Sequence, residues 1–127
     1  MKRIKILLLP VFALLFALTS SAQTAAKARG ATTEQVQLKT SAVCDMCKTR
    51  LEKAMAYEKG VQAAVLDVPT QVLTVTYRPD KTTPAKLRSA VQLTGYDADA
   101  QPADARAYEK LPDCCKKTNA IHSDGSH

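Results

Sequence analysis

Two cysteines three positions apart, Cys44 and Cys47, have the clearest capacity for chemistry in this sequence. They lie where an alternating apolar segment gives way to a helical pattern, so both sulfurs are expected near a helix start. The free backbone N–H groups and the positive end of the helix dipole there favour thiolate over thiol. Metal sites, redox dithiols and structural disulfides all use a C-x-x-C pair, so the surrounding residues must decide among them.

The chemistry of the donor set favours a soft metal ion. Thiolates bind Cu(I), Hg(II) and Zn(II) in preference to Mg or Ca. With two sulfurs and no nearby histidine, the pair suits Cu(I) or Hg(II), which are content with two ligands; Zn(II) prefers four and stays an alternative. Met46 offers a thioether between the cysteines, but it is predicted to point to solvent or to pack. Asp45 is predicted to stabilise the helix start and not to bind the metal.

A second cysteine pair, Cys114-Cys115, lies near the end of the chain. Over these few residues it resembles the mercury-capturing tail of mercuric reductases. The eleven residues before the pair span roughly 36 Å if extended, so its return to the first pair is feasible. Both cysteines are therefore accessory metal-ligand candidates, and the alternative is a pair of exposed thiols with no joint role.

Apolar periodicity predicts six elements in the order βαββαβ between residues 35 and 102. The predicted strands cover residues 36–40, 61–68, 71–77 and 96–101, and the predicted helices cover residues 44–58 and 84–94. Thr83 and Pro84 begin the second helix, and Gly60 and Gly95 follow the two helix ends. The apolar stripe of the second helix comprises Leu87, Ala90, Val91 and Leu93/Thr94.

This order predicts an α+β fold, the ferredoxin-like βαββαβ sandwich. Right-handed crossovers place both helices on one face of a four-stranded antiparallel sheet. The same path brings Cys44 and Cys47 next to the loop that holds Gly95 and Tyr96. The sequence therefore predicts a partly exposed site on loops at one pole of the domain.

Residues 35–102 resemble the heavy-metal-associated domains of copper chaperones, copper-ATPase tails and periplasmic mercury-binding proteins. The resemblance rests on Cys44-x-x-Cys47, Leu51-Glu52-Lys53-Ala54, Gly60-Val61 and Gly95-Tyr96. It implies that Cys44 and Cys47 bind the metal and that Tyr96 lies in the loop beside it. This chain has Ser41-Ala42 where the family usually has Gly-Met, which bears on the selectivity and rigidity of the site.

The N-terminal residues have the pattern of a signal peptide. Lys2, Arg3 and Lys5 form a basic start, residues 6–18 are apolar except for Pro10, and small residues end at Ala22. The apolar run is shorter than the roughly 20 residues that span a bilayer. Residues 1–22 are therefore predicted to be cleaved, with an uncleaved anchor as the alternative, and the protein is expected to be periplasmic or secreted. Residues 23–34 are predicted to be a flexible leader.

Composition argues against nucleic-acid binding. The formal charge is +6, but three basic residues belong to the signal peptide, which leaves 15 Lys and Arg against 12 Asp and Glu. No basic stripe with interleaved aromatic residues is present. The expected partners are a metal ion and a membrane metal transporter or another metal-binding protein, with the chain itself a monomer.

Three functions stay open: a metal carrier or scavenger, a thiol–disulfide oxidoreductase, and a structural domain stapled by a disulfide or zinc. The chain is short for a thioredoxin fold, and acidic Asp45 beside the thiols should raise their pKa. No Ser/His/Asp set, paired catalytic carboxylates or phosphate loop is visible. The sequence thus favours a carrier that is not an enzyme, with residues 103–127 as a tail.

Overall fold

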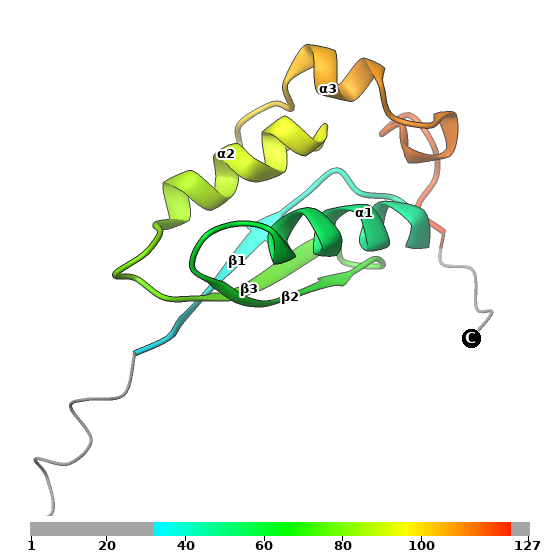
Figure 1. Cartoon of the computed structure of the whole chain (residues 1–127). Coiled ribbons are helices and arrows are strands. Elements are labelled where there is room, and N and C mark those ends of the chain that lie inside the picture. The colour runs from blue at the N-terminus through cyan, green and yellow to red at the C-terminus, as the bar shows by residue number, and fades with distance from the viewer. Residues whose placement is uncertain (1–31, 123–127) are drawn as a thin grey trace, which may run out of the picture. The chain divides into compact units, whose positions relative to one another are not determined.

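The computed structural model describes residues 32–122 (Figure 1). The predicted signal peptide and the leader up to residue 31 lie outside this range, as do the last five residues of the tail. Within residues 32–122, no helix has the length and apolar character needed to cross a membrane.

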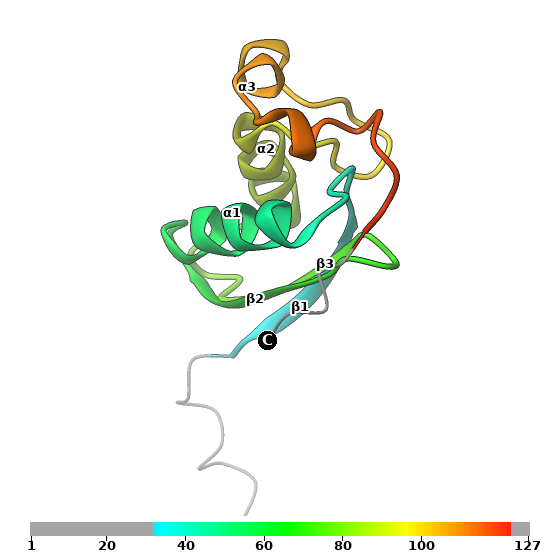
Figure 2. The ribbon, with the colours of Figure 1, turned by 90° about the vertical axis from the view of Figure 1, so that its right-hand side faces the viewer.

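The described elements follow the predicted order as far as the second helix. They are β1 (Glu34–Lys39), α1 (Asp45–Ala56), β2 (Val61–Asp67), β3 (Val72–Tyr77), α2 (Pro84–Thr94), α3 (Ala105–Glu109) and the 3₁₀ turn η1 (Asp113–Cys115). The strands form an antiparallel sheet in the order β1-β3-β2. Helices α1 and α2 cover the same face of this sheet (Figures 1 and 2).

The core lies between the sheet and the two helices. Leu73 on β3 pairs in register with Leu38 on one side and Leu66 on the other, which puts three leucines in one row. Buried side chains from the helices pack above them: Cys47, Leu51 and Met55 from α1, and Leu87, Ala90 and Val91 from α2. Leu93 was predicted to join this stripe but is 69% exposed, because it points to the opposite side of α2.

Two side chains of helix α1 form hydrogen bonds with the backbone of the edge strand β2. Glu52 accepts a hydrogen bond from the backbone N–H of Leu66 (2.9 Å), and Lys48 donates to the carbonyl of the same residue (2.8 Å). The two side chains also pair with each other at 2.5 Å. Backbone groups of an edge strand are thereby satisfied, and the helix that begins at the cysteines has a fixed position on the sheet.

The predicted fourth strand over residues 96–101 is wrong. Ala98 forms isolated bridges with Thr40 and with Gln101, so this segment turns back on itself and does not extend along β1. Aspartates explain the turn: Asp99 has φ +52° and its carboxylate accepts the Lys39 N–H (3.0 Å), while Asp97 accepts the N–H of Ala103 (2.9 Å). Aspartate is disfavoured in strands and stabilises turns through such bonds. The described sheet therefore has three strands.

The missing strand changes where the tail begins. A fourth strand beside β1 would carry the chain away from the cysteine end of the sheet. Instead, the chain stays beside the end of β1, and Asp104 donates its backbone N–H to the carbonyl of Gln92 near the end of α2 (3.1 Å). The tail, residues 103–122 of the described chain, then packs α3 against α2 (Figure 1).

The tail approaches α2 closely at Gly95, where a larger residue would not fit. It ends α2 with φ +107°, and a Cβ atom there would lie 2.9 Å from the Ala107 carbonyl oxygen and 3.0 Å from Leu111 Cγ. Gly95→Ala is expected to lower the free energy of unfolding by about 1–3 kcal/mol, because backbone strain and a contact with a carbonyl act together. Urea denaturation measures this effect. The exposed helix substitution Ser89→Ala is the control, and equal stability of the two variants would contradict the packing described.

Candidate metal centre

Cys44 is held at the start of α1 by its own sulfur. It is the N-cap residue, with extended backbone (φ −151°, ψ 169°), and its Sγ accepts the backbone N–H of Cys47 at 3.4 Å. A thiol thus takes the place of the hydroxyl or carboxylate oxygens that usually cap helices. This geometry turns both cysteine side chains toward the same point at the positive end of the α1 dipole.

The sulfurs of Cys44, Cys47 and Cys115 meet at this point and form a three-cysteine cluster. The Sγ atoms of Cys44 and Cys47 are 3.0 Å apart, and those of Cys44 and Cys115 are 3.8 Å apart. All three sulfurs lie within 4.8 Å of one another. Cys115 comes from η1 in the tail, so the cluster joins two segments that are distant in the sequence.

The cluster is buried, contrary to the expectation of a partly exposed site. Cys44 is 3% exposed, Cys47 is fully buried, and Cys115 is 1% exposed. The reason is the tail, which brings Cys115 and Leu111 over the helix start and the end of α2. A soft ion among these sulfurs would be shielded from water and from competing ligands.

Among the three cysteines of the cluster, Cys47 alone has a lowered pKa. Burial is the largest influence on its pKa and would raise it, but hydrogen bonding with the Cys44 side chain and the Val43 backbone outweighs burial, so the pKa lies below its ordinary value. Burial raises the pKa of Cys44, and its hydrogen bond with Cys47 adds to this effect. Burial also raises the pKa of the Cys115 thiol, again with Cys47 as the next cause. Cys47 therefore loses its proton more readily than Cys44 or Cys115, and a soft cation that binds the cluster displaces the remaining protons.

Tyr96 lies where the resemblance placed it, beside the cysteines. Its side chain is fully buried, and its hydroxyl has no hydrogen-bond partner among the described residues. Burial raises the pKa of this hydroxyl, and the nearby side chains of Cys47 and Cys115 raise it further. The phenol therefore stays protonated and is an available donor next to the sulfurs.

Met46 and Cys114 lie outside the cluster. Met46 is 53% exposed, as the sequence predicted for a residue on the outer side of the first helical turn. Its Sδ accepts a hydrogen bond from the half-buried Cys114 thiol at 3.6 Å. Of the two accessory candidates, the structure thus brings Cys115 to the first cysteine pair and turns Cys114 toward the methionine.

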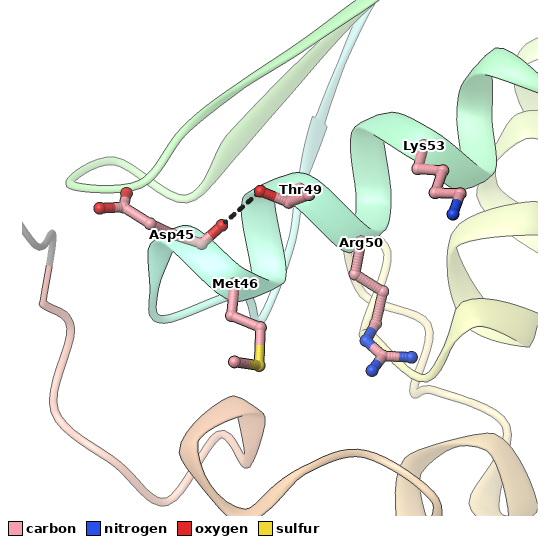
Figure 3. A pocket seen from close by; sticks show the side chains of 5 residues that line it. All are labelled: Asp45, Met46, Thr49, Arg50 and Lys53. Atoms are coloured by element: carbon pink, nitrogen blue, oxygen red, sulfur yellow. Dashed lines mark hydrogen bonds between the residues drawn. The ribbon is translucent and has the colours of Figure 1, made fainter. Parts of the chain in front are cut away.

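An open groove follows the outer side of α1 (Figure 3). Its lining comprises Asp45, Met46, Thr49, Arg50 and Lys53, with none of the cluster sulfurs among them. Figure 3 shows Met46 and Arg50 pointing from the helix toward the tail. Asp45 contributes its carbonyl, which accepts the Thr49 hydroxyl at 3.1 Å. The groove is therefore a separate feature from the three-cysteine cluster.

The fold and the cysteine cluster together define a metal-binding α+β domain. Comparison with known proteins gives the family: residues 38–97 match the heavy-metal-associated domain. Residues 38–97 thus form a heavy-metal-associated domain, which confirms the resemblance, and the three-cysteine cluster fits metal binding. The family match ends before the tail, so Cys115 lies beyond it.

Curated relatives include long proteins that carry a similar segment. The copper-exporting P-type ATPase of Staphylococcus aureus (strain JH9) is 39% identical over 70 residues, which is 54% of this chain and 9% of that protein. The enzyme of the same name from Staphylococcus epidermidis (strain ATCC 12228 / FDA PCI 1200) is 30% identical over 90 residues, or 11% of its length. The chain therefore spans only about a tenth of these relatives.

Solved structures of small proteins match over most of their own length. Oxidized MerP from Ralstonia metallidurans CH34 has a TM-score of 0.51 and 28% identity, covering 54% of this chain and 96% of that one. A CopZ metallochaperone has a TM-score of 0.50 and 26% identity, covering 51% of this chain and 98% of that one. The likeness covers about half of this chain in each case.

Proposed function

We propose that this protein is an exported carrier or scavenger of a soft metal ion, Cu(I) or Hg(II), and not an enzyme. The ion is its cargo, bound by the thiolates of Cys44 and Cys47. The observation that carries this proposal is the 3.0 Å approach of the two sulfurs at the start of α1, inside a heavy-metal-associated domain.

The donor set supports Cu(I) or Hg(II) over Zn(II). The described ligands that converge here are sulfurs, which soft ions prefer. Structural zinc sites almost always have four protein ligands, and Cys114 is turned away toward Met46. A fourth protein sulfur is therefore not in place for zinc.

The relatives support metal transfer as the biological role. The matched curated proteins are named copper-exporting P-type ATPases, and a matched small structure is named a metallochaperone. We infer that this chain exchanges its ion with a membrane transporter or another metal-binding protein.

The signal-peptide pattern of residues 1–22 supports export of the protein. The mass of the protein recovered from cells tests cleavage, and we expect it to correspond to a chain that starts at Gln23.

Competition for the metal tests the proposed function. Reduced protein is expected to hold one Cu(I) or Hg(II) ion per chain against a chelator excess that removes Zn(II), because the buried sulfurs suit ions of low coordination number. Absorbance of chelators of known affinity measures the partition of each ion. Absence of Cu(I) and Hg(II) binding, or tighter binding of Zn(II) than of both, would refute the proposal.

A further inference from the structure

We propose that Cys115 supplies a third thiolate to the site, and that the tail closes over the ion so that the protein retains its metal. The inference rests on the proposed function of Cys44 and Cys47 and extends it beyond the family's matched residues. It predicts a three-sulfur centre where the sequence pattern alone indicates two sulfurs.

The sulfur positions are those of a site that needs little rearrangement. Three thiolates bound at ~2.3 Å around one ion lie roughly 4 Å from one another. The Sγ of Cys115 is 3.8 Å from that of Cys44, and no pair in the three-cysteine cluster exceeds 4.8 Å. A soft ion at the centre could therefore contact all three sulfurs after small side-chain movements.

The 3₁₀ turn η1 separates the roles of the two neighbouring tail cysteines. Cys115 is 1% exposed and faces the cluster, whereas Cys114 is half-buried and donates to Met46. Successive side chains in a 3₁₀ turn point about a third of a turn apart, so only one of the pair can face the cluster. The chain therefore contains its own matched control, because Cys114 differs from Cys115 by one position.

Contacts before and beside Cys115 hold the tail in place. Leu111 is 5% exposed and packs against Gly95 at the end of α2. Lys116 donates to the carbonyls of Tyr108 (2.6 Å) and Glu109 (3.0 Å), and its ammonium lies 4.6 Å from the centre of the Tyr108 ring. These interactions tie η1 to α3.

Contacts after Cys115 tie the tail to the rest of the domain. Lys117 forms an ion pair with Asp97 in the loop after α2 (3.1 Å). The backbone N–H of His122 donates to the carbonyl of Val43 (2.8 Å), directly before the first cysteine. The tail is thus attached on both sides of Cys115, and Figure 2 shows it passing beside the start of α1.

Tyr96 provides an independent observation that favours a thiolate-rich centre. Its buried hydroxyl lacks a hydrogen-bond partner among residues 32–122, although such groups are nearly always satisfied in folded proteins. Burial has the largest influence on the pKa of this hydroxyl, and the adjacent side chains of Cys47 and Cys115 raise it further. A metal-bound thiolate is a better acceptor than a thiol, so binding of the ion to both cysteines gives the phenol a partner.

A third sulfur changes how the ion leaves. Transfer to a partner proceeds by exchange of one sulfur ligand for another, and the bond to Cys115 must break before the two-cysteine site is open to the partner. The tail must also move, because it covers the sulfurs. The protein should therefore release its ion slowly, as a scavenger does, and faster when Cys115 is absent.

Substitution of Cys115 and Cys114 in the full chain tests this inference. With Cu(I) bound, X-ray absorption is expected to find three sulfur neighbours in the wild type and in Cys114→Ser, and two in Cys115→Ser. Transfer of Cu(I) to a dithiol chelator should be at least about tenfold faster for Cys115→Ser than for the other two proteins, equivalent to about 1.4 kcal/mol. Cys115→Ala keeps a small apolar side chain at the buried position and serves as the second variant.

The outcomes separate this inference from the proposed function. Two sulfur neighbours and equal release rates in all four proteins would overturn the role of Cys115 while leaving the two-cysteine site intact. An equal effect of Cys114→Ser and Cys115→Ser would also overturn it. Failure of the wild type to bind Cu(I) or Hg(II) at all would instead refute the proposed function.

Discussion

Replacing Cys44 or Cys47 by serine is expected to weaken binding of Cu(I) or Hg(II) by orders of magnitude. A hydroxyl is a hard and weakly basic donor compared with a thiolate, and a soft ion loses most of its affinity when a sulfur ligand is replaced by oxygen. Competition with a chelator of known affinity measures the dissociation constants. The effect should exceed that of Cys115→Ser, because the remaining pair would no longer include both sulfurs of the C-x-x-C motif.

Cys44→Ser is the cleaner of the two substitutions. Serine is a preferred N-cap residue, so its hydroxyl can accept the Cys47 N–H and α1 should keep its start. Cys47→Ser places a hydroxyl at a fully buried position, which costs about 1–3 kcal/mol if the group stays unsatisfied. Circular dichroism checks folding, and Cys114→Ser controls for thiol loss. Near-normal affinity in both variants would show that these cysteines do not hold the metal.

Local sequence patterns predicted the elements that depend on local chemistry. Thr83 accepts the N–H of Lys86 and Pro84 begins α2, as the capping pattern indicated. Gly95 has positive φ and caps the end of α2, as a glycine after a helix end predicts. Helix α1, by contrast, ends at Ala56 with Tyr57 as its C-cap, so Gly60 lies in the turn before β2 and does not end the helix. Helix α1 begins and ends one or two residues inside the predicted range, which is the usual uncertainty of such boundaries.

The prediction of a fourth strand was wrong because hydrogen bonds to distant residues outweigh the weak alternating pattern of residues 96–101. Residues 96–101 alternate poorly, and the side chains that decide their conformation belong to Asp97 and Asp99. These carboxylates accept backbone N–H groups from Ala103 and Lys39, and Asp99 also pairs with Arg88 on α2. Such partners are not neighbours in the sequence, so the periodicity of the segment carried no sign of them.

The sequence predicted only the part of the candidate site that lies within one short segment. Cys44 and Cys47 are recognisable from their spacing and from the helix that follows. The arrival of Cys115 depends on the turn at Ala98, the packing of Leu111 on Gly95 and the attachment of His122 to Val43. Chain length showed that a return was feasible, but only the three-dimensional path distinguishes Cys115 from Cys114 and explains why the site is buried.

Oxidation of the protein is expected to abolish metal binding. The sulfurs of Cys44 and Cys47 are 3.0 Å apart, so a thiol oxidant can join them in a disulfide: two thiols lose two protons and two electrons, and the oxidant gains them. A disulfide is not a thiolate, so the Cu(I) or Hg(II) bound per chain should fall from one to about none and return after reduction. Mass measurement counts the hydrogens lost, and metal analysis counts the ions.

The same preparation separates a carrier from a thiol–disulfide enzyme. Burial of the three-cysteine cluster limits access of a protein disulfide to the Cys47 thiolate, and burial raises the pKa of Cys44 and Cys115. Exchange requires an accessible thiolate. Reduced protein should therefore accelerate insulin reduction far less than a thioredoxin does, and Cys114→Ser should behave like the wild type in both assays. Rapid insulin reduction would favour the oxidoreductase over the metal carrier. Full metal binding by the oxidised protein would instead show that the thiolates of Cys44 and Cys47 do not hold the ion.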